Sequence, residues 1–280
     1  MVRSLNRLVR RTVVLALGVL TIWLIVFVFR FTDGRLPTVL ALAVTYAIAA
    51  YILLPRIVRI GLKILQRKHV PRFTITADGL PGDPVNLLLT GTLEELRAAF
   101  RRGGWAEADR LGIVSSLRMI RAFVFNSPYP TAPFSTLFLF GRGQDIGFQR
   151  AIDNSPRKRH HIRFWALSLN YVEGDLGKPS FWLSTDRPPD AECVHWIGAG
   201  TRDTGISLTQ LTFQITHATD SDANVERDYI VGELRKSGVI AEAKLYEAGQ
   251  QLPGERVNHY VTDGEIAAAI LTVKLGAEPR

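Results

Sequence analysis

Residues 138–165 read FLFGRGQDIGFQRAIDNSPRKRHHIRFW, and this stretch decides the fold. Apolar runs that end at glycines are typical of β-strands, so the stretch predicts neighbouring strands of a sheet. Its basic segment, residues 157–159, is expected to be the turn before the strand over residues 160–167. The middle of the folded domain is therefore expected to be a sheet with polar residues collected beside it.

The chain of 280 residues is long enough for one sizeable domain and an appendage. Its single cysteine, Cys193, excludes an internal disulfide and a zinc cluster built from cysteines. The net charge of +8 is unevenly spread: residues 1–72 carry +11 (12 basic residues and one acid), and the remaining residues carry −3. A basic excess at one end suits an anionic membrane surface better than nucleic acid. We therefore expect membrane lipids as partners and no nucleic acid.

Two uncharged runs, residues 12–29 and 36–55, predict a transmembrane hairpin over residues 1–55. A bilayer core needs about 20 apolar residues of helix, because lipid offers the backbone no hydrogen-bond partner. A cleaved signal peptide is the alternative for the first run, but no small-x-small cleavage pattern follows it. Lys and Arg flank the pair on its outer sides, while the connecting loop holds few of them. The positive-inside rule then predicts a multi-pass membrane protein with both termini in the cytoplasm.

Residues 56–84 predict a basic juxtamembrane helix followed by a linker. Over residues 56–68, apolar residues recur at helical spacing and basic residues occupy the other side. Such a helix can lie in the lipid headgroup layer; the alternative is a plain cytoplasmic extension of the second span. Residues 70–84 hold three prolines and two glycines, which predicts the linker.

Residues 85–280 predict a cytoplasmic α+β domain with a mixed, largely antiparallel sheet and about three helices, since helical and strand patterns do not alternate regularly. Thr92 and Glu95 form a capping-box pattern at the start of the first helix. The second helix is expected over residues 113–124 and the third over residues 222–236. Strands are expected at residues 85–89, 136–140, 145–149, 160–167, 181–184, 192–197, 206–215, 239–246, 256–261 and 265–273.

Several short motifs between residues 83 and 240 resemble the LssY C-terminal domain and occur in the order of that family. They are Asp83-Pro84-Val85-Asn86, Leu88-Leu89-Thr90-Gly91, Gly103-Gly104-Trp105, Leu139-Phe140-Gly141-Arg142-Gly143-Gln144-Asp145, Arg159-His160-His161-Ile162-Arg163, Trp196-Ile197-Gly198-Ala199, Asp203-Thr204-Gly205-Ile206, Thr216-His217 and Glu226-Arg227-Asp228.

The resemblance implies a bacterial inner-membrane setting, with no reaction and no catalytic residues attached. LssY-like proteins are described as secretion-system components. The domain also occurs fused to membrane domains of the DedA type and of the phosphatidic-acid-phosphatase type. This chain departs from that arrangement, because it has two predicted spans and neither larger module.

Two glycine-containing motifs are similar to functional motifs, but the residues around them disfavour the functional interpretation. The G-x-G-x-x-x-G spacing at residues 141–147 is similar to a dinucleotide loop, yet no clear helix start follows it, so a turn between strands is expected. Asp203-Thr204-Gly205 is the tripeptide of aspartic proteases, which need two such aspartates, so a glycine-closed turn is expected here as well. We therefore expect no cofactor.

The histidines and aspartates offer candidates for catalysis or metal binding. His161, His217 and Asp220 are the candidate catalytic residues, although no tight catalytic motif joins them. His217, Asp220 and Asp222 could supply imidazole and carboxylate ligands to a metal. That metal site is the alternative; we expect no bound metal, because the two aspartates are expected to cap the third helix and His217 to end a strand.

Basic residues crowd around the central stretch and suggest an anion site. Arginine forks suit the oxygens of phosphate and carboxylate groups. Alternation along a strand puts His161 and Arg163 on one face and Ile162 on the other. The expected ligand-binding residues are Arg142, Asp145, Arg159, His161 and Arg163. The alternative is a solvated basic hairpin that faces the membrane.

Two functions of different classes remain open. The first is a membrane-anchored accessory protein whose cytoplasmic domain binds an anionic lipid, a phosphate ligand or a protein partner in the inner membrane. The second is a membrane-bound hydrolase that acts on a phosphate-bearing envelope substrate through a His/Asp site. The first needs only the anchor and an arginine surface, whereas the second needs convergent His and Asp side chains.

Overall fold

The computed structural model describes residues 2–65, 73–77, 79–169, 188–189, 192–208, 213, 215–247 and 260–273. The chain divides into two compact units. The first unit comprises Met1–His69, Ala77–Leu80 and Ser207–Thr216, and the second comprises Val70–Thr76, Pro81–Ile206 and His217–Arg280. The predicted fold class is confirmed: the chain combines two apolar N-terminal helices with an α+β domain of mixed, mostly antiparallel sheets.

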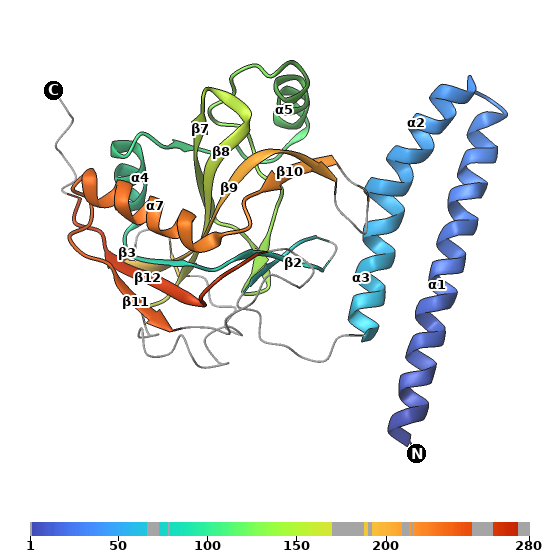
Figure 1. Ribbon diagram of the computed structural model, residues 1–280, viewed down its shortest axis with the longest axis horizontal. Coiled ribbons are helices and arrows are strands. Elements are labelled where there is room, and N and C mark those ends of the chain that lie inside the picture. The colour runs from blue at the N-terminus through green and yellow to red at the C-terminus, as the bar shows by residue number, and fades with distance from the viewer. Residues whose placement is uncertain are drawn as a thin grey trace. The chain divides into compact units, whose positions relative to one another are not determined.

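The first unit is built from the helices drawn in blue in Figure 1. They are α1 (Val2–Asp33), α2 (Thr38–Ile48), the π-helical segment η1 (Ala49–Leu53) and α3 (Leu54–Leu65). α1 runs antiparallel beside α2 and α3. Two parts of these helices, Leu15–Asp33 and Thr38–Val58, could cross a membrane by their length and apolar composition. They coincide closely with the two predicted spans.

The helix that contains the second apolar run continues without a break. η1 and α3 follow α2 directly, and the cap residues between them keep helical backbone angles. Residues 56–65 therefore extend the second apolar helix, while residues 66–72 lie outside the described part of the chain. Placement of the basic side of this helix in the headgroup layer stays a prediction.

The second unit is organised around a large sheet with the strand order β11-β12-β3-β9-β8-β7-β4, to which β10 is added beside β9 (Figure 1). β12 and β3 run parallel, and the other neighbours along this order run antiparallel. The strands are β3 (Leu87–Gly91), β4 (Ala106–Glu107), β7 (Ile146–Ile152), β8 (Ser155–Leu167), β9 (Val194–Leu208), β10 (Ile215–Thr219), β11 (Lys244–Glu247) and β12 (Glu265–Ile270).

A second, smaller sheet has the strand order β2-β1-β5-β6. Its strands are β1 (Phe73–Ile75), β2 (Pro81–Pro84), β5 (Phe138–Leu139) and β6 (Arg142–Gly143). The structure therefore places strands within residues 70–84, where the prolines predict a linker. Pro81 and Pro84 lie in the edge strand β2, where a missing N–H group costs no ladder hydrogen bond.

Two tight turns fix the registers around the central stretch. Phe140 and Gly141, with φ of 53° and 74°, join β5 to β6, so the turn predicted at Gly141 is confirmed. Asp153 and Asn154, with φ of 54° and 53°, join β7 to β8. Asp and Asn tolerate this left-handed conformation. The basic residues 157–159 consequently lie inside β8, and the prediction that they form the turn is wrong.

Three helices of the second unit lie within the described residues, at the predicted places. They are α4 (Leu93–Arg102), α5 (Ile113–Phe125) and α7 (Ala223–Lys236). Thr92 and Glu95 form the predicted capping box, and Asp222 caps α7. The strand predicted at residues 181–184 lies outside the described residues, as do residues 256–259 of another. The strand predicted over residues 206–215 is divided between the end of β9 and the start of β10.

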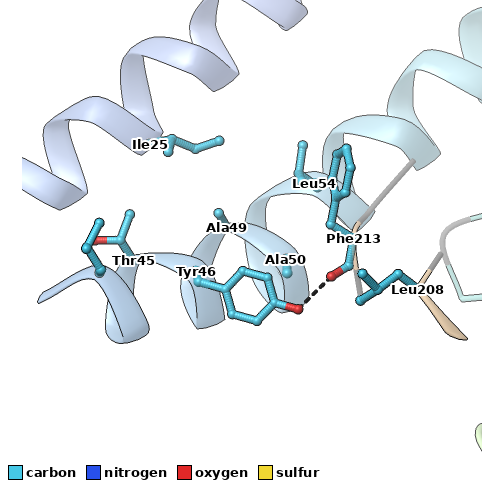
Figure 2. A pocket seen from close by; sticks show the side chains of 9 residues that line it. Ile25, Thr45, Tyr46, Ala49, Ala50, Leu54, Leu208 and Phe213 are labelled. Carbon is cyan, nitrogen blue, oxygen red and sulfur yellow. Dashed lines mark hydrogen bonds between the residues drawn. The ribbon is translucent and has the colours of Figure 1, made fainter. Parts of the chain in front are cut away.

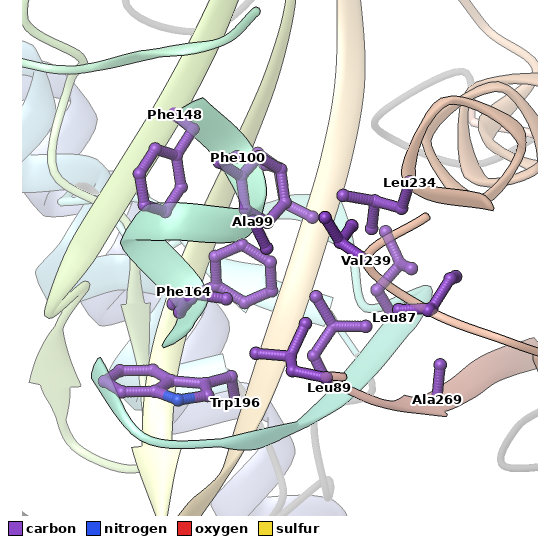
Figure 3. Close-up of a cluster of buried hydrophobic side chains, with 14 of the residues drawn as sticks. Leu87, Leu89, Ala99, Phe100, Phe148, Phe164, Trp196, Leu234, Val239 and Ala269 are labelled. Carbon is purple, nitrogen blue, oxygen red and sulfur yellow. The ribbon is translucent and has the colours of Figure 1, made fainter. Parts of the chain in front are cut away.

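Both faces of the large sheet are buried. On one face, α4 and α7 cover an apolar core in which Phe100 stacks on Phe148 at 4.4 Å and meets Phe164 edge-on at 5.4 Å (Figure 3). On the other face, Trp165 and Leu88 pack against Leu139 of the small sheet. Burial of a large apolar side chain contributes about 1.5–3 kcal/mol, so these two layers hold the sheet from both sides.

Candidate functional site

The central strand β8 distributes its side chains over the two faces as predicted. Ile162 and Phe164 enter the apolar core beneath α4 and α7. His161 and Arg163 point to the opposite face, where both are almost completely buried. A strand of 13 residues therefore carries apolar groups on one side and charged groups on the other, inside the same protein interior.

The charged face of β8 belongs to a buried charge cluster. Burial of a charge costs several kcal/mol unless an opposite charge and hydrogen bonds compensate it, so every member needs a partner. The cluster consists of Asp83, Arg159, His161, Arg163 and Asp203, with Gln149, Thr201, His217 and Tyr260 around them.

Asp83 is the first negative centre of the cluster. It lies in β2, receives a hydrogen bond from the Arg163 guanidinium, and accepts a second one from the Tyr260 hydroxyl at 2.9 Å. Burial alone would raise the pKa of Asp83, but Arg163 and His161 outweigh it and lower the pKa to about 2. Burial and Asp83 together raise the pKa of Tyr260 well above its usual value. Asp83 is therefore a permanent anion and Tyr260 a permanent donor near neutral pH.

Asp203 is the second negative centre and lies in β9, directly opposite Arg159 of β8. Arg159 Nε donates to Asp203 Oδ2 at 2.8 Å, and Arg159 Nη1 donates to Gln149 Oε1 at 2.6 Å. The Nδ1 atom of His161 lies 3.5 Å from Asp203 Oδ2. Burial would raise the pKa of Asp203, but His161 and Arg159 lower it further than burial raises it.

An aromatic ring covers the two arginines. The guanidinium groups of Arg159 and Arg163 lie 5.1 Å and 4.9 Å from the centre of the Phe134 ring. The same ring lies 5.3 Å from the ring of His161. A desolvated cation over an aromatic face is stabilised by the ring quadrupole, so Phe134 stabilises the positive side of the cluster without adding a hydrogen bond.

His217 lies at the border of the cluster and keeps 19% of its side chain exposed. Its Nδ1 atom lies 3.5 Å from Asp203 Oδ2, and its Nε2 atom lies 3.5 Å from Arg159 Nη2. Burial lowers the pKa of His217 to about 4, although Asp203 acts in the opposite direction. The imidazole is therefore neutral near pH 7, and its Nδ1 atom faces the Asp203 carboxylate without a hydrogen bond to it.

The residues expected to bind an anion are brought into two groups. Arg159, His161 and Arg163 belong to the buried charge cluster. Arg142 lies outside the cluster, in β6 of the β5–β6 hairpin. It donates to the Asp145 carboxylate and to the carbonyl oxygen of Ala166 in β8. All three arginines hold carboxylates of this chain, so an incoming phosphate would have to compete with those carboxylates.

The residues considered for catalysis or metal binding do not form one group. His161 and His217 converge on Asp203, whereas Asp220 lies 4.0 Å from Arg202 and accepts a hydrogen bond from the backbone of Asp222. Asp222 itself caps α7, as the alternative interpretation expected. Among the described residues, no group of three or more His, Cys, Asp or Glu side chains could hold a metal ion.

Sequence reasoning missed the two carboxylates that organise the cluster. Asp203-Thr204-Gly205 does not form the expected turn; it lies inside β9, where strand pairing with Arg159 holds Asp203. The signal available in the sequence was alternation, because Thr201 and Asp203 are two residues apart and so share a face. Asp83 and Tyr260 gave no local signal, since they lie 177 positions apart and meet only through the fold.

The first unit contains a separate apolar hollow (Figure 2). The Tyr46 hydroxyl donates to the backbone oxygen of Phe213 at 2.7 Å across one edge. Among the described residues that line the hollow, the other polar side chain is that of Thr45, so this lining suits an apolar occupant. It is lined by Ile25, Leu42, Thr45, Tyr46, Ala49, Ala50, Leu54, Leu208 and Phe213.

Fold and site together define a class of protein: an α+β domain, built on a buried charge cluster, that follows two apolar helices able to span a membrane. Within that class, the chain belongs to the LssY C-terminal family, because the family model for the LssY C-terminus matches residues 67–266. Comparisons with curated proteins and with solved structures found no match to the chain.

Replacing Arg163 tests whether the cluster is structural. Arg163→Ala leaves Asp83 buried without its cation, so we expect the free energy of unfolding to fall by about 3–5 kcal/mol. The control Arg202→Ala removes a half-exposed arginine at 4.0 Å from Asp220 and is expected to cost at most about 1 kcal/mol. Denaturant melts of the full chain in detergent micelles measure both. If Arg163→Ala melts normally but loses binding to anionic lipid, Arg163 is a ligand residue instead.

His217 predicts a specific loss of stability in acid. Its pKa is 6.5 when unfolded and about 4 when folded, so its neutral form stabilises the fold fully above pH 6.5. That contribution, up to about 3 kcal/mol at about 1.4 kcal/mol per pKa unit, is lost as the pH falls toward and below 4. Melts of His217→Gln should show a flatter decline over this range. An equal slope in the wild type and His217→Gln would contradict the assignment.

Proposed function

We propose that this chain is a membrane-anchored accessory protein of the bacterial inner membrane. In this proposal both termini lie in the cytoplasm, and the cytoplasmic domain binds a protein partner, an anionic lipid or a phosphate ligand in envelope or secretion processes. The observation that carries it is the direct connection between two apolar helices of membrane-spanning length and a domain of the LssY C-terminal family.

The charge distribution supports this orientation. The segments before the first apolar helix and after the second are basic, and residues 1–72 as a whole carry +11. Cytoplasmic flanks of spans are enriched in Lys and Arg, which favours the cytoplasm for the domain that follows. Arg159 and Arg163 are already paired with carboxylates of the chain, so an anionic ligand would have to compete with Asp203 and Asp83 for them.

The native cysteine tests the orientation. Cys193 is exposed and is the single cysteine of the chain, so a membrane-impermeant maleimide should label it only after spheroplasts are permeabilised. Burial raises the pKa of its thiol, so labelling is best done near pH 8. The matched control is Gly34→Cys in a Cys193→Ser background, which should react in intact spheroplasts. Labelling of Cys193 in intact spheroplasts would place the domain on the outside and overturn the orientation.

A second candidate function is favoured by the environment of His217. His217 is neutral and partly exposed, and its Nδ1 atom lies 3.5 Å from the Asp203 carboxylate; if the two closed to hydrogen-bond distance, the carboxylate would orient the imidazole as a general base. This arrangement would suit a hydrolase that acts on a phosphate-bearing envelope substrate.

Phosphate release separates the two candidates. The full chain in detergent micelles is incubated with phosphatidic acid, and release is compared with that of His217→Gln. For a binding protein we expect no difference between the two proteins. Loss of a general base typically lowers a rate about 10²–10⁴-fold. A decrease of that size in His217→Gln would contradict the binding proposal and favour the hydrolase.

A further inference from the structure

α5 carries an apolar face that nothing in the described part of the second unit covers. Residues 113, 117, 120 and 124 follow the helical spacing of one face. Their side chains should be buried in an ordinary amphipathic helix, yet Ala122 is the residue of α5 that is buried. The exposed large apolar residues of this segment, here called the α5 face, are Ile113 (83%), Val114 (71%), Leu117 (62%), Ile120 (56%), Val124 (59%) and Phe125 (74%).

The charges on α5 are of one sign. Arg118 and Arg121 are both exposed, and the helix contains no acidic residue. Arg110, also exposed, precedes the helix by three positions. An apolar stripe flanked by arginines complements a surface whose apolar layer lies beneath anionic groups.

α5 is held in place as a formed helix before any docking. At its start, the backbone N–H of Gly112 donates to Ser115 Oγ at 2.9 Å. At its end, Asn126 adopts a left-handed conformation, and Arg157 donates to the carbonyl oxygens of Phe123 and Val124 at 2.8 and 3.0 Å. Docking would therefore lose little conformational entropy, because the helix is already ordered.

We propose that the α5 face docks on an anionic bilayer surface, with its apolar side chains at the acyl boundary and its arginines at lipid phosphates. A second copy of the chain is disfavoured as the occupant, because a two-fold contact would bring Arg118 and Arg121 close to the same arginines of the copy. The inference rests on the proposed membrane anchoring, which confines the domain near lipid at a high effective concentration.

The test uses the full chain with Cys193→Ser, reconstituted in nanodiscs of phosphatidylglycerol and phosphatidylethanolamine. Leu117→Cys carries an environment-sensitive fluorophore, and a fraction of the lipids carries a doxyl quencher. We expect at least twofold quenching and a blue-shifted emission for the label at position 117. The same label on Lys236→Cys, an exposed position of α7, should remain unquenched.

Two further variants make the result specific. Ile113→Asp combined with Ile120→Asp places charges at exposed positions, so the melting temperature should stay unchanged while quenching at position 117 is lost. Arg118→Gln combined with Arg121→Gln should weaken quenching several-fold, as should discs of neutral phosphatidylcholine. Equal quenching in anionic and neutral discs would overturn the electrostatic part and with it the proposal.

A label on Val19→Cys, in α1, distinguishes failure of this inference from failure of the anchoring. If the label at 19 is quenched and the label at 117 stays in water, the bilayer proposal is overturned and the anchoring stands. If neither label is quenched, the anchoring fails and the bilayer proposal fails with it. If the label at 117 is shielded without quenching and energy transfer between copies appears, the face is a contact between copies and the bilayer proposal is overturned.

Discussion

The neutralisation of two buried carboxylates is the constraint on which the second unit depends. Asp83 lies in the small sheet and Arg163 in the large one, so their ion pair ties one sheet to the other. Asp203 and Arg159 lie opposite each other on β9 and β8, so their pair fixes the register of the two longest strands. A slip of either strand by one residue would turn its own charged group into the apolar core and leave the buried partner on the other strand unpaired.

This constraint shapes what the domain can do. Arginines that hold internal carboxylates, as Arg159 and Arg163 do, give rigidity to the sheets and leave few free donors for a ligand. His217, at the border of the cluster, is neutral near pH 7 and partly exposed. The surface proposed to bind a large partner lies elsewhere, on α5, which presents apolar side chains and arginines together.

The features that the sequence predicted are those with a local cause. The capping box of Thr92 and Glu95, the start of α7 at Asp222 and the alternation along β8 each depend on neighbours within a few positions. Only the basic residues of the cluster were predicted, because they all lie within β8. The two carboxylates, Asp83 and Asp203, come from the other strands β2 and β9. Asp83 illustrates the reason: its proline-rich surroundings are typical of a linker, and only the pairing of β2 with β1 turns them into an edge strand.

The exposed face of α5 follows from the way the rest of the domain closes. α4 and α7 cover one face of the large sheet and the small sheet packs on the other, so both faces have their partners before α5 is added. The apolar periodicity of α5 predicts a helix, but it does not predict whether another element of the domain covers the apolar side. Large exposed apolar patches lower solubility and rarely occur on soluble proteins without an interaction to cover them. Because the flanking groups are arginines, the surface that covers this face at the lowest electrostatic cost is an anionic one.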